Sequence, residues 1–172
     1  MPERVTNKIS RLEQLPDEIL LDLFENYVRL VDIYLSFVPI NNRRINRIIK
    51  SCRFYIDIPS KDVYHPKSFT QYADQIISIH LSTYSSDLDP LKFVNLRFLH
   101  IEKPSRSQLL SIRPEFLPNL LYLSLSPCWY SLKELPRYLT NISNVCPFKN
   151  LRFCILPDGK LIRFQQQEQH SS

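Results

Sequence analysis

The chain has a single glycine, Gly159, among its 172 residues. Loops that hold the phosphates of nucleotides need several glycines close together, because the backbone must turn sharply and approach the ligand. The sequence therefore contains neither a mononucleotide-binding nor a dinucleotide-binding motif. Long apolar runs are also missing, since no stretch reaches the roughly 20 apolar residues that a membrane-spanning helix requires. We expect no membrane partner.

The cysteines are few, and no two of them form a C-x-x-C pair, so their spacing predicts no zinc site. The N-terminal segment is polar and lacks the apolar core of a secretory signal, so we expect a cytoplasmic or nuclear protein. In that reducing compartment cysteines behave as small buried apolar residues. The four are Cys52, Cys128, Cys146 and Cys154.

No Ser/His/Asp or Cys/His arrangement in the sequence has a spacing that suggests catalysis, and we expect a non-enzymatic protein without a cofactor or a metal. A cysteine nucleophile stays open on sequence alone, although Cys154 falls on an expected core position and Cys146 precedes a proline. The histidines His65 and His170 stand in no recognisable motif.

The net charge of +5 raises the question of a nucleic-acid partner. One short segment carries five basic residues, whose summed charge equals the net charge of the whole chain. The rest of the chain is therefore close to neutral. A single basic helix is more typical of a solvated face than of a nucleic-acid interface, and a nucleic-acid-associated protein is the weakest of three interpretations. The five residues are Arg43, Arg44, Arg47, Lys50 and Arg53.

Residues 12–53 have the periodicity of three short helices. Pro16 suits a first helical position, and acidic residues follow it near the positive end of the helix dipole. A second helix is expected over about 31–38, ended by Pro39, and a third from Asn41 or Asn42. The first helix carries a broad apolar stripe formed by Ile19, Leu20, Leu23, Phe24, Tyr27 and Val28.

After residue 53 the spacing of the apolar residues changes from that of a helix to that of a strand. Residues 54–58 alternate between apolar and other side chains, as in a half-buried strand. Four later segments then match L-x-x-L-x-L, with starts separated by 20, 24 and 31 residues, and between them lie helix starts with capping boxes at Ser105 and Ser131. The four segments are QIISIHL (75–81), NLRFLHI (95–101), NLLYLSL (119–125) and NLRFCIL (150–156).

Strands alternating with helices predict a parallel sheet, and Pro157-Asp158-Gly159 predicts a closing hairpin. The expected fold class is α+β: a three-helix module, then a short α/β solenoid with a curved parallel sheet. An ordinary small α/β domain is the alternative to the solenoid. The expected ranges are a flexible N-terminus at 1–11, the helical module at 12–53, the sheet domain at 54–164 with strands near 54–58, 76–81, 96–101, 120–125, 151–156 and 161–164, and a disordered tail at 165–172.

The two halves together resemble the F-box family, and more narrowly its members with leucine-rich repeats. At the N-terminus the resemblance rests on Leu15-Pro16-Asp17-Glu18-Ile19-Leu20, the spaced Leu23 and Phe24, Asp32-Ile33, and the Asn- and Arg-rich third helix. The repeats extend it to about residue 156. Members of this family are substrate receptors of SCF-type cullin–RING ubiquitin ligases.

The resemblance implies that the helical module docks on a Skp-type adaptor and through it on the cullin scaffold, while the repeats hold an unidentified target protein. The residues implied at the adaptor are Leu15, Pro16, Ile19, Leu20, Leu23 and Phe24. We expect Leu15, Pro16 and Ile19 on the docking side, and Tyr27 and Val28 mostly inside the module. A repeat scaffold without a ligase role is the second interpretation.

Side chains between the buried leucines should face outward in two columns. The first column is Ser78, Phe98, Tyr122 and Phe153, and the second is His80, His100, Ser124 and Ile155. A row of exposed aromatic rings suggests a target-binding surface, although the rings could instead pack against one another or under another part of the chain. The target-binding candidates are Phe98, Tyr122, Phe153, His80 and His100. As a metal pair the two histidines lack a third ligand in the sequence pattern.

Overall fold

A computed structural model describes residues 11–58, 66–82, 92–126 and 146–164. The chain divides into two compact units, Met1–Cys52 and Arg53–Ser172. Apart from Arg11, the segments expected to be flexible or disordered lie outside the described residues, as does the helix start expected at Ser131. Within the described ranges no helix combines the length and the apolar character needed to cross a bilayer.

The first unit is helical, and its two regular helices begin where local chemistry favours a start. After a turn of 3-10 helix, η1 (Arg11–Gln14), comes α1 (Asp17–Asn26), with Pro16 just before its first helical residue. Helix α3 (Arg43–Ser51) begins after Asn42, whose side chain accepts hydrogen bonds from the backbone N–H groups of Arg44 and Ile45 at 2.9 and 3.2 Å. These contacts satisfy two of the backbone donors that a helix start leaves unpaired.

The segment expected as one α-helix over 31–38 takes three forms in succession. A short α-helical turn, α2 (Leu30–Asp32), is followed by the π-helical η2 (Ile33–Phe37) and the 3-10 turn η3 (Val38–Ile40). Pro39 ends the helical segment as expected, because it has no N–H to donate and its ring crowds the carbonyl four residues earlier. The prediction of a regular α-helix before it was wrong in form, since residues 33–37 are π-helical.

The core of the first unit is built from few residues of α1. Leu20 and Phe24, one helical turn apart, are fully buried, and the ring of Phe24 meets that of Phe37 edge-on at 5.0 Å between centroids. Tyr27 is 75% exposed, so the expectation that it holds the module together was wrong. Among the described residues of the unit, the other buried ones are Leu30, Ile33, Ile45, Ile48, Ile49 and Cys52.

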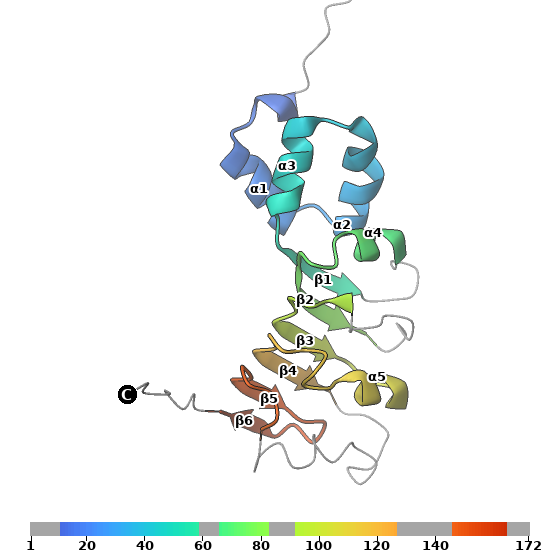
Figure 1. Cartoon of the computed structure of the whole chain (residues 1–172), viewed down its shortest axis with the longest axis vertical. Helices are drawn as coiled ribbons and strands as arrows, with labels where there is room; N and C mark the ends of the chain where they lie inside the picture. The colour runs from blue at the N-terminus through green and yellow to red at the C-terminus, as the bar shows by residue number, and fades with distance from the viewer. Residues whose placement is uncertain (1–10, 59–65, 83–91, 127–145, 165–172) are drawn as a thin grey trace, which may run out of the picture. The chain divides into compact units, whose positions relative to one another are not determined.

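The second unit is built on one sheet whose described strands lie in chain order. The strands are β1 (Phe54–Ile58), β2 (Ile76–Leu81), β3 (Phe98–Ile101), β4 (Tyr122–Leu125), β5 (Phe153–Ile155) and β6 (Leu161–Arg163). Strands β1 to β5 pair in parallel, and β6 pairs antiparallel with β5. Figure 1 shows them one beneath the next, with the short helices α4 (Pro66–Gln71) and α5 (Arg106–Ser111) on the same side. The mixed α+β class and the mostly parallel sheet are as expected.

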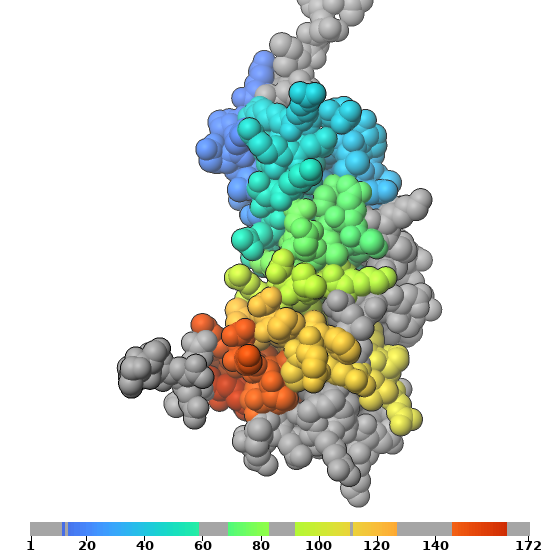
Figure 2. All heavy atoms as spheres, in the orientation of Figure 1, coloured from blue at the N-terminus to red at the C-terminus, as the bar shows by residue number. Residues whose placement is uncertain are grey.

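The last three L-x-x-L-x-L segments enter the sheet two residues later than expected. The first leucine of each is buried, but its backbone N–H donates to a turn rather than to a neighbouring strand: Leu96 to Phe93 at 3.0 Å and Leu120 to Leu117 at 3.2 Å. The ladder begins only after these turns. In Figure 2 the colours over the described parts of this unit follow one another in chain order, as sequential strands require.

Two local predictions in this unit are confirmed. At the start of α5, the backbone N–H of Gln108 donates to Ser105 Oγ at 3.2 Å, and the N–H of Ser105 donates to Gln108 Oε1 at 2.8 Å, which completes the capping box. The hairpin between β5 and β6 turns at Gly159, whose φ of +80° lies in the left-handed region that favours glycine. The only glycine of the chain therefore stands where the backbone requires one.

Candidate functional site

The aromatic column lies on the open face of the sheet in the register expected from the sequence. Phe98 pairs with Tyr122 and Tyr122 with Phe153 on three neighbouring parallel strands. Buried residues alternate with them along the strands, so the three rings share the face opposite the core. Phe98 and Phe153 are each 39% exposed and Tyr122 is half-buried. The rings therefore reach the surface of the molecule.

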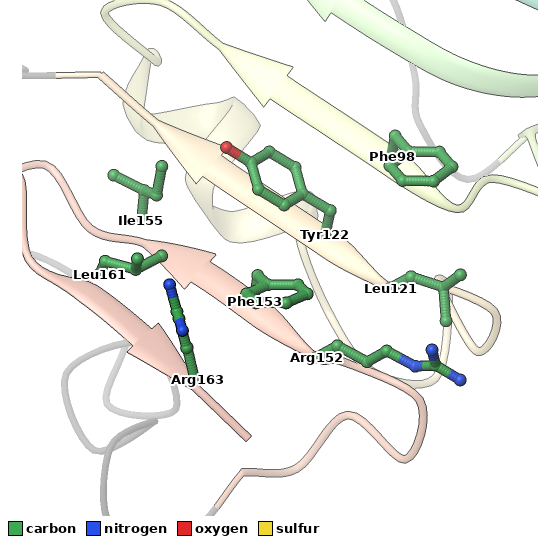
Figure 3. Close-up of a pocket in the computed structure, with 8 residues that line it drawn as sticks. All are labelled: Phe98, Leu121, Tyr122, Arg152, Phe153, Ile155, Leu161 and Arg163. Atoms are coloured by element: carbon green, nitrogen blue, oxygen red, sulfur yellow. The ribbon is translucent and has the colours of Figure 1, made fainter. Parts of the chain in front are cut away.

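A groove of about 530 Å³ runs along this column and the closing hairpin. Figure 3 shows its lining: the rings of Phe98, Tyr122 and Phe153 stand on successive strands, and Ile155 and Leu161 extend the apolar surface toward β6. Leu121 completes the apolar part of the lining. A concave apolar surface of this size can accept several side chains of another protein.

The charged residues that line the groove among the described residues are both cationic. Arg163, on β6, stands opposite Phe153 on β5, and its guanidinium carbon lies 6.0 Å from the centroid of that ring. Arg152, which precedes the same phenylalanine, is exposed. An apolar floor with guanidinium groups at the rim favours a ligand segment that combines apolar side chains with carboxylates.

A second hollow of about 330 Å³ adjoins the groove and shares Phe98 and Tyr122 with it. Its lining includes His80 and His100, which pair directly across β2 and β3 as expected. The next member of that column, Ser124, is buried, contrary to the alternation, whereas Ile155 beyond it is half-buried and lines the groove. The polar members of this column that stay partly exposed are therefore the two histidines.

Carboxylates surround the histidine pair. His80 Nδ1 lies 3.1 Å from Asp57 Oδ1, and His80 Nε2 lies 3.4 Å from Glu102 Oε1. The two imidazole rings are 4.5 Å apart between centroids, at 68° to each other. The pKa of His100 is lowered, first by burial and then by the neighbouring His80, while Glu102 and Asp57 act in the opposite direction. The inference that this pair lacks a third potential ligand was wrong, because Glu102 supplies one.

The first unit offers a second apolar surface along the start of α1. Ile19 is 52% exposed, Pro16 is exposed, and Leu15 and Leu23 are half-buried. Two of the six residues implied at the adaptor interface are instead fully buried in the unit itself. Leu20 and Phe24 have no surface to offer a partner while the unit is folded, and we remove them from the candidate docking set.

An ion-pair cluster fixes the backbone beside this surface. Arg44 Nε donates to Asp17 Oδ1 at 2.7 Å, and Arg47 Nη2 donates to Asp17 Oδ2 at 2.9 Å, so one carboxylate holds two residues of α3. Arg44 also donates to the backbone carbonyl of Leu15. The hydrogen bond from Arg44 and the charges of both guanidinium groups lower the pKa of Asp17, with burial acting in the opposite direction. Sequence reasoning had treated these arginines only as a solvated basic face.

The described cysteines are not prepared for nucleophilic chemistry. Burial raises the pKa of Cys52 and of Cys154 to about 12, with a smaller contribution from Glu25 for the first and from Cys146 for the second. Burial also raises the pKa of Cys146. A catalytic thiol needs a lowered pKa and access to substrate, and none of these three combines the two.

Sequence reasoning missed Leu161 and Arg163 as members of the groove. The hairpin signal at Asp158-Gly159 could have found them, because it brings residues 161–163 beside Phe153. No family model matches this sequence, and comparisons with curated proteins and with solved structures gave no match either. The candidate surfaces therefore depend on the geometry of this chain alone.

Proposed function

We propose that the protein is a non-enzymatic adaptor that links a target protein to an SCF-type ubiquitin ligase. In this role the first unit binds a Skp-type adaptor, and the groove of the second unit binds the target. The observation that carries the proposal is an apolar edge outside the buried core of Leu20 and Phe24. It is formed by the half-buried Leu15 and the exposed Pro16 and Ile19. The protein would act in the cytoplasm or the nucleus.

Burial within the first unit supports the docking half of the proposal. Helix α1 uses two fully buried side chains, Leu20 and Phe24, for the core of its own unit, while Ile19 stays 52% exposed and accessible to a second helix or groove. Arg44 donates to the carbonyl of Leu15 and holds Asp17, so the start of the docking edge is bound to α3. An edge that is already ordered loses less conformational entropy on binding.

The open face of the sheet supports the target-binding half. The groove at Phe98, Tyr122 and Phe153 combines aromatic surface with two arginines, and aromatic residues and arginine are the types that contribute most at protein interfaces. The mechanism is proximity. A chain that binds the ligase with one unit and a target with the other raises the effective concentration of the target at the site of ubiquitin transfer, and it performs no bond chemistry itself.

Co-purification of the full chain with a Skp-type adaptor tests the proposal. The wild type should bind and the double variant Leu15→Asp/Ile19→Asp should not, because two carboxylates in an apolar interface would be desolvated without partners. The control is Tyr27→Asp, which places one carboxylate on an exposed residue at the end of α1. Circular dichroism establishes that each variant is folded. Failure of the folded wild type to bind, or equal binding by the double variant, would contradict the ligase role.

A protein-binding scaffold without a ligase role is the second candidate, and the groove favours it independently of the first unit. Under that function, variants of the groove abolish target binding while the Skp-type adaptor never binds. The basic face of α3 gives less support to a nucleic-acid partner, because Asp17 already pairs with Arg44 and Arg47. Binding driven by phosphate contacts would weaken steeply as salt is raised.

A further inference from the structure

Four ionisable side chains gather at the end of three neighbouring strands, outside the groove. Asp57 lies on β1, His80 on β2 and His100 on β3, where they are directly paired, and Glu102 follows the last residue of β3. His80, His100 and Glu102 each offer a ligand atom, and these atoms lie within 4.8 Å of one another. All three residues are partly exposed toward the solvent.

The surroundings of His80 decide which of its nitrogens is free. Its Nδ1 lies 3.1 Å from a carboxylate oxygen of Asp57, and this proximity favours the tautomer that has its proton on Nδ1. In that neutral tautomer Nε2 carries a lone pair, and it lies 3.4 Å from a carboxylate oxygen of Glu102. Nε2 is also a buried atom without a hydrogen-bond partner among the described residues. Two acceptor atoms this close repel each other, and a cation bound between them would remove that repulsion.

The spacing fits a metal ion as that cation. A tetrahedral zinc ion with bonds of about 2.0–2.1 Å places its ligand atoms about 3.3–3.4 Å apart, which matches the separation of His80 Nε2 and Glu102 Oε1. His100 lies against the ring of His80 and supplies the third ligand after a small closure. We propose that His80, His100 and Glu102 bind a divalent transition metal, Zn²⁺ in the first instance.

Asp57 has the position of an outer partner in this site. Histidines that bind metals usually donate their second ring N–H to a carboxylate, which fixes the tautomer and raises the basicity of the ligating nitrogen. Asp57 lies 3.1 Å from His80 Nδ1, within reach for this role. Two nitrogens and one oxygen suit zinc, and three protein ligands leave one position of a tetrahedral site open for water or for a side chain of a bound protein.

A proton on His80 Nε2 is the alternative to a metal ion between this nitrogen and Glu102. If His80 were an imidazolium, it would bridge Asp57 and Glu102 as a pair of ion pairs, and no metal would be needed. The proton and the metal ion lead to opposite expectations for a Zn²⁺ titration. A site already satisfied by a proton gives no saturable response to Zn²⁺ at neutral pH, whereas the proposed site binds one ion in each chain.

The experiment uses the full chain without a histidine tag, treated with EDTA, dialysed and titrated with Zn²⁺ by calorimetry and with Co²⁺ by visible absorption. The wild type should bind one ion and show the intense d–d bands of tetrahedral Co²⁺. Glu102→Gln and His100→Ala should weaken binding by at least tenfold, and Asp57→Asn by roughly tenfold to a hundredfold. His65→Ala and His170→Ala are the controls and should bind as the wild type does.

Two results would overturn the proposal. One is the absence of saturable Zn²⁺ binding by the folded wild type. The other is binding by Glu102→Gln and His100→Ala as tight as that of the wild type, which would place the ion elsewhere. Circular dichroism of each variant identifies loss of fold, and Glu102→Gln keeps the test valid if a histidine variant fails to fold, because it only exchanges a partly exposed carboxylate for an amide.

Discussion

Asn150 donates a hydrogen bond from its side-chain Nδ2 to the backbone carbonyl of Pro118, 2.9 Å away, and so joins the turn before β5 to the turn before β4. The same contact recurs one strand earlier, from Asn119 to Val94 at 3.0 Å, and again from Asn95 to Asp74 at 2.7 Å. Each asparagine stands one residue before the first leucine of its segment. The recurring asparagine therefore pairs a carbonyl of the preceding turn and holds successive strands at a fixed spacing.

Replacing these asparagines should destabilise the second unit in steps. Asn119→Ala and Asn150→Ala each remove one side-chain hydrogen bond, so each should lower the free energy of unfolding by about 0.5–1.5 kcal/mol. Urea unfolding followed by circular dichroism measures the change. Lys149→Ala, at the exposed neighbouring position, is the matched control and should have almost no effect. Equal effects of Lys149→Ala and Asn150→Ala would contradict the role of the amide.

The core and surface positions of α1 should respond very differently to truncation. Leu20→Ala should lower the free energy of unfolding of the first unit by about 2–5 kcal/mol, because it leaves a cavity at a fully buried position. Ile19→Ala, at the next residue, should change it by no more than about 0.5 kcal/mol because the side chain is already 52% exposed. The measurement is urea unfolding of the full chain. A large loss of stability in Ile19→Ala would place Ile19 in the core and remove it from the docking edge.

The sheet could be predicted from the sequence because its pattern is repeated. Four segments with the same spacing indicate the same local structure, and aligning them gives the register that pairs Phe98 with Tyr122 and Tyr122 with Phe153. The hairpin was predictable because Gly159 has a specific backbone requirement. What the pattern could not give was the start of each strand, since Leu96 is buried in a turn as completely as it would be in a strand.

The helical unit was less predictable, because an apolar stripe on a helix does not say which of its members face inward. Leu20 and Tyr27 belong to the same stripe in the sequence, yet the first is fully buried and the second is 75% exposed.

The candidate metal site also could not be predicted in full from the sequence. Glu102 lies just beyond the end of β3, where strand alternation assigns no direction to a side chain, so its approach to His80 required the folded chain.

The stability of the first unit should fall in acid through Asp17. Its pKa is lowered below the ordinary value of 3.8 in the folded state, chiefly by the hydrogen bond from Arg44. The stabilisation is therefore fully present above that ordinary value, which the unfolded chain has, and is lost as the pH falls through the lower pKa of the folded state. Urea midpoints measured between about pH 6 and pH 2.5 should fall less steeply in Asp17→Asn than in the wild type.

A double-mutant cycle identifies the partner responsible for that pH dependence. Asp17→Asn and Arg44→Gln should not be additive, because each removes the same hydrogen-bonded ion pair. If the two effects simply add and the acid dependence of Arg44→Gln equals that of the wild type, the contact between the two side chains does not stabilise the unit.

The described cysteines should differ in their reaction with iodoacetamide at pH 8. With a pKa raised to about 12, Cys52 and Cys154 have a thiolate fraction about a thousandfold smaller than a thiol of ordinary pKa near 9, and both are buried. Cys146 is partly exposed and should be labelled first. Peptide mass spectrometry over time measures the order, and labelling in urea confirms that all sites react once unfolded. Labelling of Cys154 in the folded chain as fast as Cys146 would show that β5 opens readily, and a sheet that opens there could not present Phe153 as a fixed part of the groove.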